Sequence, residues 1–144
     1  MKNMLERGKF TFAMIKPVAV ERGDIGNIIQ IIEQKGFRIA AIKKTQLSKS
    51  LAEEFYQEHH GKDYFEGLTD FMVSGPVIAL VLEKEDAVSD YRKIIGSTNP
   101  DHADEGTIRK LFAETMRKNA VHGSDADESA LRETNLIFKE HEIY

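Results

Sequence analysis

Two short apolar runs limit the folds open to this chain. Phe10–Ile15 and Val77–Leu82 are rich in apolar and β-forming side chains, which is typical of strands buried within a sheet. Between them, apolar residues recur at helical spacing over Ile25–Ile32, and Gly36 is expected to end that helix. The chain therefore alternates strands with amphipathic helices.

The remaining segments continue this alternation. Either Ser48 or Ser50 is expected to cap a helix that runs to Tyr56, and Asp125-Ala126-Asp127-Glu128 has the form of a capping box. The other expected elements are a strand from Phe37 to about Leu47, helices over Phe65–Val73, Asp86–Ile95 and Thr107–Phe112, a strand over Ala120–His122 and a helix ending near Leu136.

The order of these elements is β-α-β, two helices, then β-α-β. It predicts an α/β (α+β) sandwich of the ferredoxin-like βαββαβ type, with a four-stranded antiparallel sheet, helices on one face and added helices. An open, doubly wound parallel sheet is the alternative. The long loop Ser97–Gly106 is an addition in either plan, and loops of this length are often functional.

Length and composition favour one domain over residues 1–144, with a polar N-terminal extension (1–9) and a C-terminal tail (139–144). The net charge is −4 and the signs are interspersed, which argues against a nucleic-acid partner because such binders usually carry a basic face. The absence of cysteine excludes disulfides and thiolate metal sites. No apolar run is long enough to span a bilayer and no secretory segment precedes the first strand, so we expect a cytoplasmic protein without a membrane partner.

The heptad Asn119-Ala120-Val121-His122-Gly123-Ser124-Asp125 contains the main candidate for chemistry. His122 stands between the end of a buried strand and a turn, and Gly123 is expected to give a ligand room near the backbone. Neutral imidazole, with an unperturbed pKa of about 6.5, can accept a phosphoryl group without a separate base. The alternative is a half-buried histidine that bonds a backbone carbonyl.

Cationic and polar residues at strand ends and loops indicate an anion site. Lys16 and Asn119 end strands, Thr98 lies in the long loop and Arg109 follows it. Any one cation is more often a solvated surface charge, but strand ends and loops are where binding residues collect. Phosphoryl transfer depends mainly on positioning and on neutralising phosphate oxygens, so this set fits that chemistry.

The chain resembles the nucleoside diphosphate kinase family from about Phe10 to Phe138. The matching segments, in the family's order and spacing, are Met14-Ile15-Lys16-Pro17, Glu21-Arg22-Gly23, Lys35-Gly36-Phe37, Ser74-Gly75-Pro76-Val77, Gly96-Ser97-Thr98-Asn99-Pro100, Gly106-Thr107-Ile108-Arg109 and the heptad around His122. The resemblance implies transfer of the terminal phosphoryl group from a nucleoside triphosphate to a nucleoside diphosphate. It further implies a ping-pong cycle through phosphohistidine, which maintains the triphosphate pools.

The resemblance also implies a role for each matching residue. His122 corresponds to the phosphorylated histidine, Glu133 to the carboxylate on its other ring nitrogen, Ser124 to the link from that carboxylate to the turn, and Tyr56 to a tyrosine near the imidazole. Residues that correspond to nucleotide contacts are Arg92, Thr98 and Arg109 for the phosphates, Lys16 and Asn119 for the ribose, and Tyr64, Leu68 and Met116 for the base.

Cofactor and assembly are implied in the same way. The resemblance implies Mg²⁺ held mainly by nucleotide phosphates and water, with no metal-ligating side chains, and a tetramer or hexamer built from dimers. The tail 139–144 is expected to contact a neighbouring subunit or to be disordered. The family pattern is broken at Val18, Tyr64, Lys110-Leu111 and Arg117-Lys118, and the last two pairs are expected in loops near the base or the subunit contacts.

A catalytically silent nucleotide-binding domain and a nucleic-acid-binding scaffold are the rival interpretations. The first predicts damage to His122 or to the cationic set, which are intact. The second predicts a basic face and salt-sensitive binding.

Overall fold

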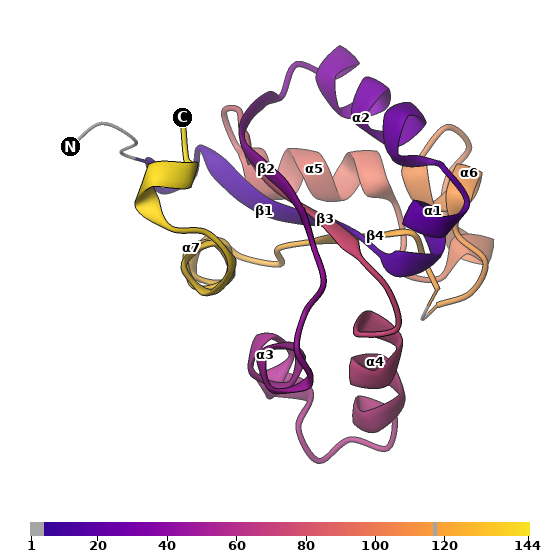
Figure 1. Ribbon diagram of the computed structural model, residues 1–144. Coiled ribbons are helices and arrows are strands. Elements are labelled where there is room, and N and C mark those ends of the chain that lie inside the picture. Colours follow the sequence, from indigo (N-terminus) through magenta and orange to yellow (C-terminus); the bar gives the residue numbers. More distant parts are fainter. Residues whose placement is uncertain (1–4, 117) are drawn as a thin grey trace.

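Four antiparallel strands form the sheet at the centre of the computed structural model, which describes residues 5–116 and 118–144 (Figure 1). The strands are β1 (Phe10–Ile15), β2 (Arg38–Thr45), β3 (Val77–Glu83) and β4 (Val121–Gly123), in the order β2-β3-β1-β4. Every neighbouring pair is antiparallel, so the ferredoxin-like prediction is confirmed and the parallel alternative is wrong.

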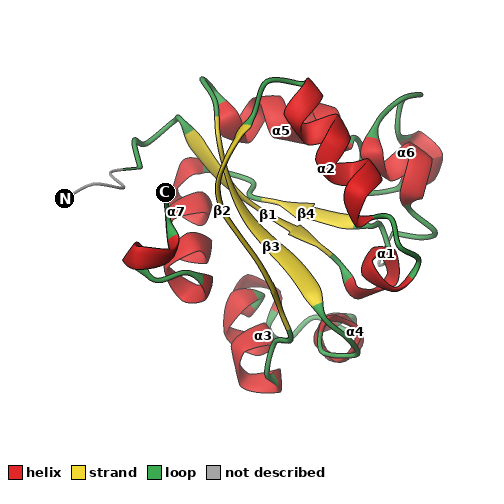
Figure 2. Cartoon of the chain, turned by 45° about the horizontal axis from the view of Figure 1, so that its top comes forward, coloured by secondary structure: helices red, strands yellow, loops and turns green. Residues whose placement is uncertain are grey.

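Helices cover both faces of this sheet, whereas the sequence-based plan placed them on one (Figure 2). The helices α1 (Pro17–Glu21), α2 (Ile25–Gln34), α5 (Ala87–Ile95) and α6 (Ile108–Phe112) share one apolar core with the sheet. The helices α3 (Lys49–Phe55), α4 (Phe65–Met72) and α7 (Asp127–Ile137) share the other. Short 3₁₀ turns lie at η1 (Gln57–His59), η2 (Pro100–His102) and η3 (Glu140–Glu142).

The alternation of side chains along β1 explains the two covered faces. Phe12 and Met14 point into the core of α3, α4 and α7, while Ala13 and Ile15 point into the core of α2 and α5. All four are fully buried, and a strand that is apolar on both faces must be covered on both. The apolar runs that predicted buried strands thus also account for two helical layers.

The helix caps settle the alternatives that the sequence left open. Ser48 rather than Ser50 accepts the Leu51 amide at the start of α3, and Thr107 caps α6 as predicted. The predicted capping box at Asp125 is wrong: α7 begins at Asp127, and its N-cap Ala126 has no side-chain bond to offer. Asp125 instead accepts a hydrogen bond from the Ser129 hydroxyl.

Strand β2 departs from simple alternation because it carries a bulge. The pairing with β3 shifts between Ile39 and Ala41, so that Ala40 and Ala41 are both buried. The C-terminal tail lies against this part of the strand in its own chain: Ile143 is buried and the Tyr144 amide donates to the Ala40 carbonyl at 2.7 Å. The expectation of a disordered tail is therefore wrong.

Gly123 has a packing role that differs from the expected one. A Cβ at this position would lie 2.8 Å from Cδ2 of Tyr91 and 3.1 Å from Cδ1 of Ile95. The buried Tyr91 ring of α5 therefore occupies the space in which a side chain at this position would lie. The close approach brings α5 against the strand that carries His122.

We expect Gly123→Ala to lower the free energy of unfolding by about 1–3 kcal/mol, because the methyl group overpacks a buried site. Urea denaturation measures this change. Gly26→Ala is the matched control: nothing lies within 4 Å of its added methyl group, so a small gain of about 0.5 kcal/mol is expected in helix α2. The cost of Gly123→Ala should shrink in a Tyr91→Leu background, and an equal cost there would contradict the packing explanation.

Candidate active site

A cavity of about 610 Å³ opens beside β4 and gathers the predicted site residues. Every one of them except Ser124 lines it, and Ser124 lies directly behind, bonded to the lining residue Glu133. Lining residues outside the predicted set are Phe55, Glu58, His59, Gly123 and Asp125. A second cavity of about 640 Å³, between α1 and the loop before β3, contains none of the predicted residues.

The imidazole of His122 is held by rings on one side and by a carboxylate on the other. Its ring centroid lies 5.0 Å from that of Phe55 and 6.2 Å from that of Tyr56. Nε2 lies 2.9 Å from Oε1 of Glu133, and the side chain keeps 16% of its surface exposed. No residue of the described chain bonds Nδ1, so that nitrogen is left for a ligand.

A chain of hydrogen bonds joins Glu133 to the sheet. The buried carboxylate accepts the Ser124 hydroxyl at 2.8 Å, and the Ser124 oxygen accepts the Phe12 amide of β1 at 3.1 Å. A carboxylate in this position favours the proton on Nε2 of His122 and so leaves a lone pair on Nδ1. Nδ1 is therefore the nitrogen that can offer a lone pair to a ligand in the cavity.

Lys16 and Asn119 form a buried pair at the inner end of the cavity. Lys16 Nζ donates to Asn119 Oδ1 at 2.9 Å. Burial, and then the charge of Arg109, lower the pKa of Lys16 to about 7. The Lys16 amide also donates to the carbonyl of Ala120, whose φ of 75° lies in the left-handed region that L side chains rarely adopt.

Arg109 is fixed in place by backbone carbonyls. Its two terminal nitrogens donate to the carbonyls of Gly96 at 3.0 Å and Val121 at 3.1 Å. Its Nε is buried and has no partner in the part of the chain that the structure describes. Burial chiefly lowers the pKa of Arg109 to about 10, and the charge of Arg92 contributes. Within the described chain, neither arginine forms an ion pair, nor does Lys16, so the cavity gathers positive charge that an anion would neutralise.

Tyr56 adds a neutral donor to this set. Its hydroxyl is buried and has no hydrogen-bond partner among the described residues, and burial together with the charge of Glu133 raises the pKa of the phenol. The group therefore keeps its proton and can donate it to a ligand oxygen.

The outer end of the cavity is aromatic and apolar. Tyr64, with 44% of its surface exposed, and Met116 line it together with Leu68. The Tyr64 hydroxyl lies 2.7 Å from Nδ1 of His59.

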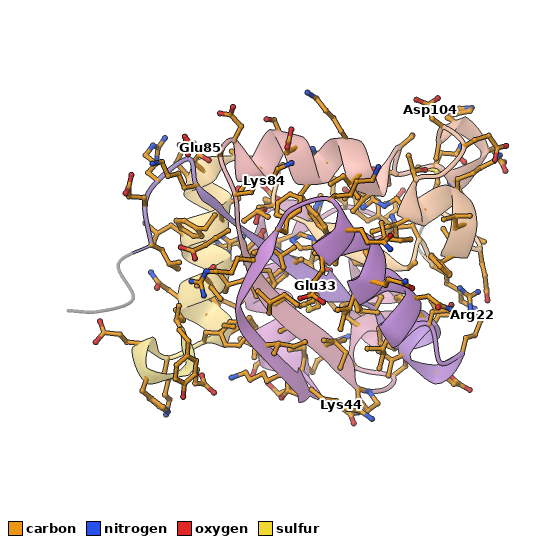
Figure 3. The ribbon with its side chains drawn as sticks, turned by 90° about the horizontal axis from the view of Figure 1, so that it is seen from above. Arg22, Glu33, Lys44, Lys84, Glu85 and Asp104 are labelled. Atoms are coloured by element: carbon orange, nitrogen blue, oxygen red, sulfur yellow. The ribbon has the colours of Figure 1, made fainter. Side chains whose placement is uncertain are left out.

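Arg22 holds the segment that carries Met116. It follows α1 at the edge of the molecule (Figure 3), and it bonds the Phe112 carbonyl and Oε2 of Glu114, the latter at 2.8 Å. Lys110 and Leu111 lie in α6, not in a loop as expected, and Arg117 lies outside the described residues.

The role of His59 was missed by sequence reasoning. Adjacent histidines in a helix diverge, and the pair at 59 and 60 was expected to be a solvated helix end. The chain instead forms the 3₁₀ turn Gln57–His59, in which His59 lines the cavity while His60 packs on Phe65 with centroids 5.3 Å apart. Nothing in the local sequence distinguishes the two.

Among the described residues, no group of three or more His, Asp or Glu side chains is placed to hold a metal.

Comparisons with known proteins agree on one family. The family model described as "Nucleoside diphosphate kinase" matches residues 9–143. A nucleoside diphosphate kinase of Lawsonia intracellularis is 50% identical over 132 residues, covering 92% of this chain and 96% of the relative. One from Histophilus somni is 52% identical over 134 residues, covering 93% and 95%.

Solved structures of nucleoside diphosphate kinases superpose closely on this chain. The nucleoside diphosphate kinase of Aquifex aeolicus superposes with a TM-score of 0.93 at 41% identity, over 94% of this chain and 99% of that one. The enzyme of Halobacterium salinarum, solved in complex with CDP, superposes with a TM-score of 0.92 at 38% identity, over 95% of this chain and 91% of that one.

No helix in residues 5–116 or 118–144 is long and apolar enough to cross a membrane. The chain belongs to the nucleoside diphosphate kinase family, whose members use a divalent metal and transfer the terminal phosphoryl group of a nucleoside triphosphate to a nucleoside diphosphate through a phosphohistidine.

Proposed function

We propose that Nδ1 of His122 is the atom that accepts and returns the phosphoryl group. The observation that supports this most directly is the asymmetry of the ring: Nε2 is bonded to Glu133, while Nδ1 is unbonded on a side chain that lines the cavity. In the first half-reaction, the Nδ1 lone pair attacks the γ-phosphorus, and the bond from that phosphorus to the bridging oxygen breaks. The nucleoside diphosphate leaves with that electron pair, and a second diphosphate reverses the step.

The cationic residues stabilise the transferring group in this proposal. Arg92, Thr98 and Arg109 contact the phosphates, and Arg109 is held for the task by its two carbonyl bonds. Lys16 and Asn119 contact the ribose hydroxyls, and Lys16 also lies close to the transferring phosphate. Tyr56 donates from its unpartnered hydroxyl to the γ-phosphoryl oxygens.

The nucleobase stacks at the outer end of the cavity. Tyr64 and Met116 form its two walls, with Leu68 beside Tyr64. Every base presents a π face, so stacking of this kind tolerates base identity. This suits an enzyme that takes several nucleotides as substrates.

Magnesium enters as part of the triphosphate substrate in this proposal. It is bound mainly by phosphate oxygens and water, while Lys16, Arg92 and Arg109 of the cavity lining face the remaining phosphate charge. The metal neutralises phosphate charge, while the protein side chains position the phosphorus in line with Nδ1.

We further propose a homo-oligomer built from dimers, either a tetramer or a hexamer, in the cytoplasm. In this proposal residues 1–144 form one domain. Strand β2 lies at the edge of the sheet, with Ile42 exposed on it, and an edge strand is a place where a second copy can pair. Sedimentation at several concentrations would measure the assembly.

Protein mixed with γ-labelled ATP and Mg²⁺ should become labelled, and the label should move to GDP as GTP on addition of that acceptor. His122→Ala removes the accepting nitrogen, so we expect labelling to fall by at least about 1,000-fold. His141→Ala, in the exposed turn η3, is the control and should label normally. Label that persists in the His122 variant would contradict the assignment.

Nucleotide binding should take up a proton because of Lys16. In the protein without nucleotide, Lys16 has a pKa of about 7, so its side chain is mostly neutral at about pH 8.5. A polyphosphate that binds beside it favours the charged form. Uptake on binding of the ADP–Mg²⁺ complex should approach one proton near pH 8.5. It should fall away near pH 6, where Lys16 is already charged.

Calorimetric titration in buffers of different ionisation enthalpy measures the uptake. Lys16→Met should abolish it, whereas Lys93→Met, an exposed lysine of α5, should leave it intact. Equal uptake in the Lys16 variant would show that another group takes the proton.

A further inference from the structure

A hydrogen bond at the rim of the cavity lies outside the network that holds the nucleophile. His59 Nδ1 and the Tyr64 hydroxyl are 2.7 Å apart, and both residues line the cavity. Tyr64 is the residue before α4, and 44% of the surface of this residue is exposed. A side chain this exposed, at a helix start, is less restricted in its rotamer than a buried one.

The surroundings of His59 favour one of the two tautomers that this bond allows. Oε1 of Glu58 lies 3.9 Å from His59 Nε2, on the opposite side of the ring from Tyr64. A carboxylate there attracts the ring proton to Nε2. Nδ1 then presents its lone pair, and the Tyr64 hydroxyl donates to it.

His59 is itself placed against the aromatic cluster of the nucleophile. Its ring centroid lies 6.2 Å from that of Tyr56, whose ring lies 6.2 Å from that of His122. The centroids of His59 and Tyr64 are 5.4 Å apart. A continuous series of rings thus runs from the phosphoryl-accepting nitrogen to the outer end of the cavity.

We propose that His59 is a positioning residue for the nucleobase, which fixes the Tyr64 ring as a stacking wall by holding its hydroxyl. This inference rests on the proposed function, in which Tyr64 stacks on the base. The bond pre-orders the ring, so a bound base does not have to restrict it. It also occupies the hydroxyl proton, which leaves the π face as the surface that Tyr64 presents to every base.

Single-turnover phosphorylation by ATP and Mg²⁺ separates binding from chemistry. His59→Leu and Tyr64→Phe each remove the bond, and each should raise the ATP concentration at half-maximal rate by about 3- to 10-fold. The rate of phosphohistidine formation at saturating ATP should stay within about 2-fold, because His122 keeps its own contacts. In the Tyr64→Phe background, His59→Leu should have no further effect.

A conservative variant and a neighbour complete the design. His59→Asn places a side-chain oxygen near the position of Nδ1, so it should restore most of the affinity. His60→Leu, which changes the adjacent histidine outside the cavity, should leave the half-maximal concentration unchanged. Thermal unfolding of each variant checks that it is folded.

The outcomes separate this inference from the proposed function. Wild-type affinity in both single variants, additive effects in the double variant, or a loss confined to the saturating rate would each overturn the role of His59. None of these results would affect label transfer through His122. Absence of labelling in the unmodified protein would instead overturn the proposed function.

Discussion

The buried carboxylate of Glu133 is the group on which the rest of this structure depends. Burying an ionised carboxylate costs several kcal/mol unless hydrogen bonds compensate it. Here the compensation comes from Ser124, which is bonded to the backbone of β1, and from Nε2 of His122 on β4. The same bonds that make the charge tolerable fix α7 on the sheet and orient the imidazole, so fold and nucleophile share one set of interactions.

Buried positive charge makes the part of the cavity around Lys16 and Arg109 costly to fold. Burial lowers the pKa of Lys16 to about 7 and that of Arg109 to about 10. The charge of Arg109 contributes to the shift of Lys16, and the charge of Arg92 to that of Arg109. Ala120 keeps a left-handed backbone between Asn119 and β4. Like charges and strain of this kind oppose folding and persist where the surrounding structure enforces them. An anionic ligand relieves the charge part of that cost, which is a physical reason for the site to prefer a polyphosphate.

The sequence predicted the four strands and an antiparallel sheet, because these follow from apolar patterning and the order of the elements. It also named residues at strand ends and loops that the structure gathers around one cavity. It predicted helices on one face, whereas the two-sided apolar character of β1 requires both. It could not choose between Ser48 and Ser50, since both precede a helix with suitable spacing and tertiary packing decides. The contact between His59 and Tyr64 was missed because a 3₁₀ turn, not a helix, sets the direction of that imidazole.

What the sequence predicted and what it missed correspond to a difference in rigidity between the two ends of the cavity. The end of the cavity where we propose that phosphates bind is built from the sheet and from backbone carbonyls, as in the bonds of Arg109 to Gly96 and Val121. The base end is built from exposed side chains, and its outer segment is held through the side chain of Arg22. The reaction needs the phosphorus and the imidazole nitrogen aligned to a fraction of an ångström, whereas a base has only to be stacked. A stiff phosphate end with a pre-ordered but adaptable base end therefore combines accurate transfer with tolerance of the nucleotide.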